Sequence, residues 1–106
     1  LQSDGRHRPR RDFAGADLTR ADFTGTSLKK AQFDRVEMRG VIFADSCLQG
    51  ARIFRSNALQ GSFERADLAG ADLRGSNFYE AEFWDASTGG ADFSLSNLKA
   101  TKLWNL

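Results

Sequence analysis

The 106-residue sequence is poor in several residue types, and each shortage excludes a class of protein. It has one cysteine, Cys47, so neither an internal disulfide nor a cysteine-based metal cluster can form. Its one histidine, His7, precedes the patterned part of the chain and has no rigid element on which to build a catalytic triad. The single proline and ten glycines include no phosphate-binding glycine motif. We therefore expect no catalytic, cofactor or metal site, no small-molecule substrate, and a protein that is not an enzyme.

The sequence also lacks long apolar runs and an excess of charge. No stretch approaches the roughly 18 apolar residues of a membrane span, and no signal-peptide core is present. The 15 Lys and Arg residues nearly cancel the 14 Asp and Glu residues, whereas nucleic-acid binders are usually basic. We expect a soluble protein without a nucleic-acid partner, and we favour the cytoplasm. Because the sequence begins at Leu1, a processed organellar or lumenal form and a domain of a longer chain stay open.

What the chain has in abundance is a period of five. From Phe13 to Leu103, seventeen of nineteen positions spaced five apart carry a large apolar side chain, the exceptions being Ala58 and Thr88. The residue two places earlier is small or β-branched in every repeat except the first, where it is Arg11. The position between these two is mostly polar, often Asp or Asn. The large series is Phe13, Leu18, Phe23, Leu28, Phe33, Met38, Phe43, Leu48, Ile53, Ala58, Phe63, Leu68, Leu73, Phe78, Phe83, Thr88, Phe93, Leu98 and Leu103.

A period of five fits neither an α-helix nor a flat strand. On a helix, steps of five turn by about 140°, which would spread the large residues over every face. On a strand they would alternate between the two faces. Only a coil that repeats every five residues keeps all of them in one interior. Each repeat then buries one large and one small residue and leaves three positions for corners and solvent.

Tandem units such as Ala16-Asp17-Leu18 and Ala66-Asp67-Leu68 resemble the pentapeptide-repeat family, and the resemblance covers residues 11–105. It implies an all-β fold, a right-handed quadrilateral β-helix with one repeat per side, four repeats per coil and just under five coils. With coils about 4.8 Å apart, the rod would be about 23 Å long. We expect residues 11–106 to form this solenoid and residues 1–10 to form a basic, flexible arm.

Four repeats per coil would place residues twenty apart above one another, so that phenylalanines stack in ladders inside the rod. The register that buries Ile53 and Ala58 leaves Phe54 and Leu59 facing solvent. The recurring Asp and Asn side chains are expected to accept hydrogen bonds from backbone amides at the corners. At Thr88, the two following glycines predict a widened turn, with a binding notch as the alternative.

Two surface features stand out as candidate sites. Large side chains predicted to point outward from the C-terminal coils would form an exposed patch of several hundred Å², of the kind found at protein contacts. A basic run before the first repeat would contact an anionic partner. Glu80, Glu82 and Asp85 cluster nearby, but without His or Cys they predict a solvated acidic surface rather than a metal site. The patch comprises Leu59, Tyr79, Trp84 and Trp104, and the basic run contributes Arg6, Arg8, Arg10 and Arg11.

Two functions follow, from different classes. We favour a non-enzymatic interaction or scaffold module that presents a rigid surface to a protein partner or to a second copy, including an end-to-end homodimer. The alternative is a DNA mimic that binds DNA gyrase or a topoisomerase, as the quinolone-protection members of the family do. B-DNA carries one charge per about 1.7 Å, so a mimic of this length needs about thirteen negative charges. Residues 11–106 carry 13 acidic and 12 basic residues, a net charge of −1.

Overall fold

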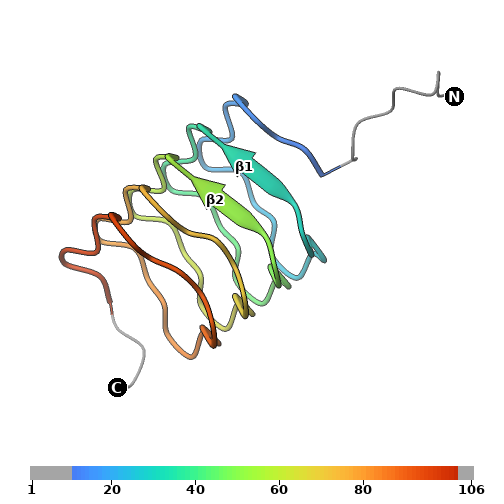
Figure 1. Ribbon diagram of the computed structural model, residues 1–106, viewed down its shortest axis with the longest axis vertical. Coiled ribbons are helices and arrows are strands. Elements are labelled where there is room, and N and C mark those ends of the chain that lie inside the picture. Colours follow the sequence, from blue (N-terminus) through green and yellow to red (C-terminus); the bar gives the residue numbers. More distant parts are fainter. Residues whose placement is uncertain (1–10, 103–106) are drawn as a thin grey trace, which may run out of the picture.

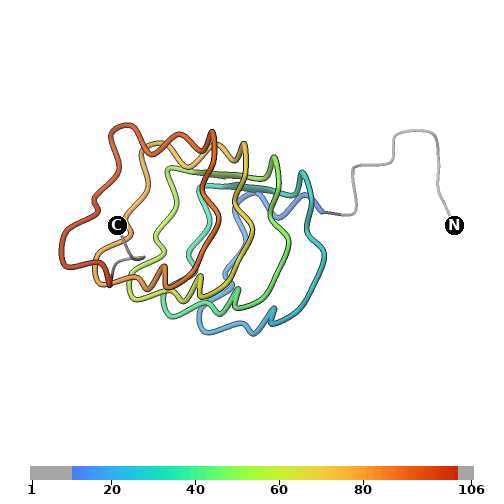
Figure 2. The same ribbon diagram turned by 90° about the horizontal axis from the view of Figure 1, so that it is seen from below.

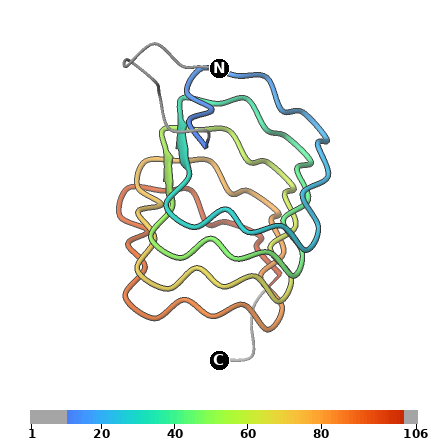
Figure 3. The ribbon, with the colours of Figure 1, turned by 90° about the vertical axis from the view of Figure 1, so that its right-hand side faces the viewer.

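The computed structural model describes residues 11–102, which wind into a stack of similar rectangular coils (Figures 1 and 3). Parallel backbone bridges join the residue between the two inward positions of each repeat to its equivalent twenty positions later, from Asp12 and Gln32 at one end to Glu82 and Lys102 at the other. The pairing of Gln32 with Arg52 lengthens into two short parallel strands, β1 (Gln32–Asp34) and β2 (Arg52–Phe54). The right-handed quadrilateral β-helix with four repeats per coil is therefore confirmed.

The coil has four sides, which we number by the large residues that they bury. Each side contributes one large inward residue per coil, and Figure 2 shows the sides stacked in columns. Side 1 contains Phe13, Phe33, Ile53, Leu73 and Phe93; side 2 contains Leu18, Met38, Ala58, Phe78 and Leu98; side 3 contains Phe23, Phe43, Phe63 and Phe83; side 4 contains Leu28, Leu48, Leu68 and Thr88.

The core is densest in the middle coils. Side 3 is a ladder of parallel rings in which Phe63 lies 5.4 Å from Phe43 and 5.0 Å from Phe83, measured between ring centroids. Phe78 of side 2 meets both Phe63 and Phe83 edge-on, at 5.7 and 5.8 Å. Offset stacks and edge-to-face contacts are the arrangements that aromatic quadrupoles favour. The end coils, by contrast, leave Phe13 and Phe93 half-buried.

Every corner from residue 15 to residue 100 has the same backbone form. The last residue of each repeat has a positive φ, whether it is Gly25 at 71° or Arg20 at 62°. At most corners an N–H closes the turn onto the carbonyl three residues earlier, as from Ala16 to Phe13 at 3.0 Å. A positive φ at the third residue alone defines a type II turn. Eleven of these residues are not glycine, and they accept a strained conformation because stacked coils fix the corner.

The predicted register is confirmed, with one adjustment. Ile53 and Ala58 are fully buried, whereas Phe54 and Leu59 point outward but are half-buried rather than fully exposed. The predicted widening at Thr88 is wrong. The amide of Ala91 donates to the Thr88 carbonyl at 3.0 Å, which is the ordinary corner bond, so the two glycines occupy a regular turn.

The mostly polar residues between the two inward positions of each repeat stack into a column, which we call the polar column. Its Asp and Asn side chains accept backbone hydrogen bonds, as predicted. In repeat after repeat the Asp or Asn oxygen accepts the amide N–H two residues later, for example from Thr19 to Asp17 at 3.1 Å and from Tyr79 to Asn77 at 3.0 Å. Hydrogen bonds to the charged form lower the pKa of a carboxyl group. Four aspartates of this column and Asp45 at a corner therefore have a pKa below the ordinary value, chiefly because a neighbouring Thr, Ser or Arg donates to them. The aspartates with a lowered pKa are Asp17, Asp22, Asp45, Asp72 and Asp92.

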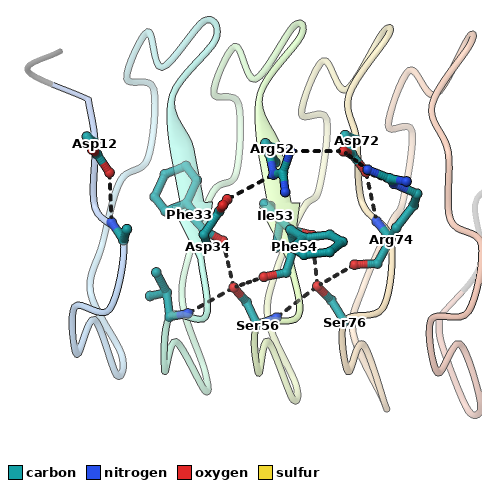
Figure 4. A network of polar contacts seen from close by, with 12 residues as sticks. Asp12, Phe33, Asp34, Arg52, Ile53, Phe54, Ser56, Asp72, Arg74 and Ser76 are labelled. Atoms are coloured by element: carbon teal, nitrogen blue, oxygen red, sulfur yellow. Dashed lines mark hydrogen bonds and ion pairs between the residues drawn. The ribbon is translucent and has the colours of Figure 1, made fainter. Parts of the chain in front are cut away.

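At the middle corners of side 1, serine hydroxyls replace the corner bond, as Figure 4 shows for Ser56 and Ser76. Ser56 Oγ accepts from the Val36 amide at 3.0 Å and donates to the Phe33 carbonyl at 2.7 Å, both in the preceding coil. Ser76 repeats the arrangement one coil later, accepting from the Ser56 amide at 3.0 Å. Each buried serine thus satisfies two backbone groups of the corner before it and links neighbouring coils.

Candidate interaction surface

The aromatic patch predicted from the sequence is largely at the surface. Tyr79 is 38% exposed and Trp84 is 46% exposed, although the phenylalanine rings at the inward positions of the middle coils are buried. Leu59 stands one coil before Tyr79 in the same column and is half-buried. Trp104 lies outside the described residues, so the patch is described here through its other three members.

The corners at the two edges of side 3 hold Tyr79 and Trp84. Tyr79 is the penultimate residue of a side 2 repeat, and Trp84 has the same place in the next repeat, which forms side 3. Within residues 11–102, neither ring stacks on another aromatic ring. The two therefore border a strip of side 3 instead of packing together, and Glu82 lies between them on the polar column.

Side 3 is the acidic side of the rod. Its outward positions carry five carboxylates and two basic residues, a net charge of −3. In its middle coils this charge is partly neutralised, because Arg65 binds Asp45 at 2.7 and 2.9 Å and Glu64 at 2.8 Å. The Arg65 hydrogen bond holds the pKa of the Asp45 carboxyl below its ordinary value. The five carboxylates belong to Asp22, Asp45, Glu64, Glu82 and Asp85, and the two basic residues are Arg65 and Lys102.

The carboxylates beside the two exposed rings differ from those of the middle coils, because they form no ion pair within residues 11–102. In the described part of the chain, Glu82 and Asp85 have no ion-pair partner. Glu80, at the corner beside Tyr79, accepts a hydrogen bond from the neutral Gln60 amide at 2.8 Å. Three carboxylates and two exposed rings thus lie within seven residues. We call Tyr79, Glu80, Glu82, Trp84 and Asp85 the acidic-aromatic strip.

Of the predicted basic residues, only Arg11 falls in the described region, where it is exposed. Arg6, Arg8 and Arg10 lie outside the described residues, so the structure does not address their predicted contact with an anionic partner. The predicted flexible arm of residues 1–10 lies outside them as well.

A second aromatic feature, on side 1, was not predicted. The guanidinium carbons of Arg52, Arg74 and Arg55 lie 4.3, 5.3 and 5.4 Å from the centroid of the Phe54 ring. Guanidinium groups at such distances are attracted by the negative face of the ring. The sequence held a signal for this cluster, since two arginines flank Phe54 and Arg74 follows it by twenty residues, which is one coil.

The side 1 cluster is mostly satisfied within the molecule (Figure 4). Arg52 Nε and Asp34 Oδ1, both buried, lie 3.0 Å apart as an ion pair without the alignment of a hydrogen bond. Arg74 binds Asp72 through two hydrogen bonds of 2.7 and 2.9 Å, which lower the pKa of the Asp72 carboxyl and raise the pKa of Arg74. Arg52 thus links neighbouring coils through Asp34 and Asp72, whereas Arg74 is paired within its own repeat.

Catalytic chemistry has no evident location in the described region. Within residues 11–102, no three of His, Cys, Asp and Glu lie close enough together to hold a metal ion, and no pocket opens in the surface. Cys47 is half-buried on the polar column of side 4. This part of the chain also contains no helix long and apolar enough to cross a membrane.

Comparison with known proteins places this geometry in a family context. A family model described as pentapeptide repeats matches the chain in eight copies, over residues 12–45, 46–85 and 76–106. None of the curated protein sequences compared matches the chain.

Several solved structures share the fold. HetL, a pentapeptide repeat protein involved in heterocyst differentiation regulation from Nostoc sp. strain PCC 7120, has a TM-score of 0.69 and 18% identity, covering 89% of this chain and 49% of its own. A pentapeptide repeat protein of the Arabidopsis thaliana thylakoid lumen has a TM-score of 0.55 and 30% identity, with 79% and 62% covered. A second Nostoc protein has a TM-score of 0.62 and 25% identity, with 79% and 65% covered. The chain therefore spans between 49% and 65% of the length of these structures.

Proposed function

The chain belongs to the pentapeptide repeat family, and on this premise we propose that it is a non-enzymatic interaction module that binds a protein partner through the acidic-aromatic strip. The observation that carries the proposal is the exposure of Tyr79 and Trp84, at 38% and 46%, on a fold that buries the phenylalanine rings at the inward positions of its middle coils. Tyr and Trp are the residues most often found at the energetic centres of protein interfaces.

The rigidity of the rod supports this use of the surface. The backbones that hold Tyr79 and Trp84 are tied to the preceding coil, where Gln60 N donates to the Tyr79 carbonyl at 2.8 Å and Arg65 N donates to the Trp84 carbonyl at 2.7 Å. A surface that is already ordered loses little conformational entropy when a partner binds. Large rings on fixed backbone positions are therefore efficient contact residues.

The test is affinity capture from the native extract, followed by reconstitution with the purified partner. Wild type is compared with a Tyr79→Ala/Trp84→Ala variant, and circular dichroism checks that both are folded. Leu95→Ala is the matched control, because Leu95 is 93% exposed but lies on a side 1 corner away from the strip. We expect the double variant to bind the reconstituted partner at least tenfold more weakly and the control to bind normally. Equal binding by all three proteins would remove the strip from the interface.

The alternative is the DNA mimic, and the net charge of −3 on side 3 is the observation that favours it. Against it stands Arg65, which neutralises part of that surface through Asp45 and Glu64. A DNA mimic should inhibit gyrase-catalysed supercoiling at stoichiometric concentrations, whereas an interaction module of the proposed kind should leave supercoiling unchanged.

A further inference from the structure

The exposed rings of the acidic-aromatic strip need a partner that also suits the charge around them. Tyr79 and Trp84 stand at the two edges of side 3, with Glu80 and Glu82 between them in the sequence and Asp85 directly after Trp84. In residues 11–102 no arginine or lysine forms an ion pair with any of these three carboxylates. A guanidinium group suits both kinds of neighbour, because it stacks on aromatic faces and binds carboxylates with two hydrogen bonds. The chemistry therefore favours an arginine-rich segment as the occupant.

The chain itself contains such a segment. Residues 6–11 read Arg-His-Arg-Pro-Arg-Arg, so four of six residues are arginine. In an extended peptide alternate side chains project to the same side, which would align Arg6, Arg8 and Arg10 at steps of about 6.6 Å. Pro9 favours extended backbone for itself and for the residue before it. Three aligned arginines match the three unpaired carboxylates in number.

The segment is too short to reach the strip of its own copy. Arg6 lies six residues before Asp12, so full extension carries it about 20 Å at most from that residue. Glu82 follows Asp12 by seventy residues, or three and a half coils, which is about 17 Å along the axis, and it lies on the opposite side of the rod. The path must also pass around a whole intervening side, so a second copy is the available source.

We propose that residues 6–11 of one copy bind the acidic-aromatic strip of a second copy of this chain. This inference rests on the proposed function, since it names the partner of the same surface. Two copies that exchange their basic segments would close into a two-fold dimer, because each would supply one segment and one strip. The contact is made by exposed charges, so it weakens as salt rises.

The test is the association state of the full chain, measured by sedimentation velocity at about 50 mM and about 500 mM salt, on either side of physiological screening. Three charge variants accompany wild type. Glu80→Lys/Glu82→Lys/Asp85→Lys reverses the strip, and Arg6→Glu/Arg8→Glu/Arg10→Glu reverses the segment. The control, Arg20→Glu/Lys29→Glu/Lys30→Glu, reverses three exposed basic residues of the first coil and changes the net charge as much as the segment variant does.

We expect wild type and the control to dimerise at low salt and to dissociate at high salt. Each of the other two variants should self-associate at least tenfold more weakly. Mixed in equal amounts these two variants should pair, because the basic segment of one meets the acidic strip of the other and the acidic segment of the second meets the basic strip of the first. Mixing either variant with wild type should give only one-sided association. A single protein that combines all six reversals should dimerise again, since its acidic segment then faces a basic strip.

A wild type that stays monomeric at low salt would overturn the proposal, and so would a dimer that survives reversal of the strip. Failure of the six-fold reversed protein to dimerise, although circular dichroism shows it to be folded, would also overturn it. A monomeric wild type that still binds a free peptide of residues 4–12 would assign the strip to arginine-rich segments of another protein. Capture of another protein through Tyr79 and Trp84 would support the proposed function even if the dimer failed to form. Failure of the dimer and failure of the proposed function are therefore distinguishable.

Discussion

Shortening Phe63 to alanine tests the central ladder of the core. Phe63 is fully buried, its ring stacks between those of Phe43 and Phe83, and Phe78 packs against it edge-on. Phe→Ala substitutions at buried sites cost about 3–5 kcal/mol, because apolar contact is lost and a cavity remains. The coils above and below are tied by backbone hydrogen bonds and cannot collapse into that cavity, so we expect about 4 kcal/mol. That is a large share of the 5–15 kcal/mol by which domains are typically stable.

The assay is equilibrium unfolding in urea, followed by circular dichroism, with Phe13→Ala as the matched control. Phe13 stacks on Phe33 at 4.9 Å but belongs to the first described coil and is half-buried. Because part of the space it vacates is open to water, we expect about half the loss, or about 2 kcal/mol. A Phe63→Ala loss below that of Phe13→Ala would refute the view that the stacked rings of the middle coils dominate stability.

Three further predictions concern corners and charge. Ser56→Ala should lower the free energy of unfolding in urea by about 1–3 kcal/mol, because the buried Val36 amide and the Phe33 carbonyl lose their partner. An unchanged free energy would mean that the Val36 amide bonds directly to the Phe33 carbonyl instead. Gly40→Ala should cost more than Gly25→Ala, each measured as a shift in thermal midpoint. Both have a positive φ, which costs a non-glycine residue about 1–2 kcal/mol, but only at Gly40 would the new Cβ lie 3.3 Å from Arg20 Cγ. Finally, the aspartates with lowered pKa values release protons more readily when folded, so their stabilisation is present above the unfolded pKa of about 3.9 and is lost as pH falls through the folded pKa. The thermal midpoint should be level from pH 7 to 5 and should fall below about pH 4; a midpoint that rises on acidification would contradict this.

The interior of this fold could be predicted almost completely from the sequence. A period of five admits only one arrangement in which Phe33, Ile53 and Leu73 share an interior, and the small residues at Ala51 and Ser56 fix the register. The hydrogen bonds from the polar column were predictable for the same reason, because each is made to a residue two places along the chain. Local chemistry and strict periodicity determine both.

Contacts between coils were harder to predict, because they depend on where long side chains turn. The same feature that placed Phe54 outward did not show that Arg52, Arg55 and Arg74 would gather around its ring. The serine hydroxyls were expected only as small inward residues, yet Ser56 holds two backbone groups of the preceding coil. At the interaction surface, the exposure of Tyr79 followed from its repeat position, whereas the lack of ion pairs to its acidic neighbours within residues 11–102 required the structure.

The twenty-residue coil gives the length of any insertion a geometric meaning. Adding one pentapeptide ahead of Tyr79 would leave every later repeat internally intact but would move it to the next side of the rod. The acidic-aromatic strip would then lie a quarter turn away from the earlier side 3 repeats on which it is now stacked. Adding four pentapeptides would restore its direction and advance it by a single coil, about 4.8 Å along the axis. In this fold, therefore, changes in length act as rotations, and only multiples of twenty residues preserve which way a surface faces.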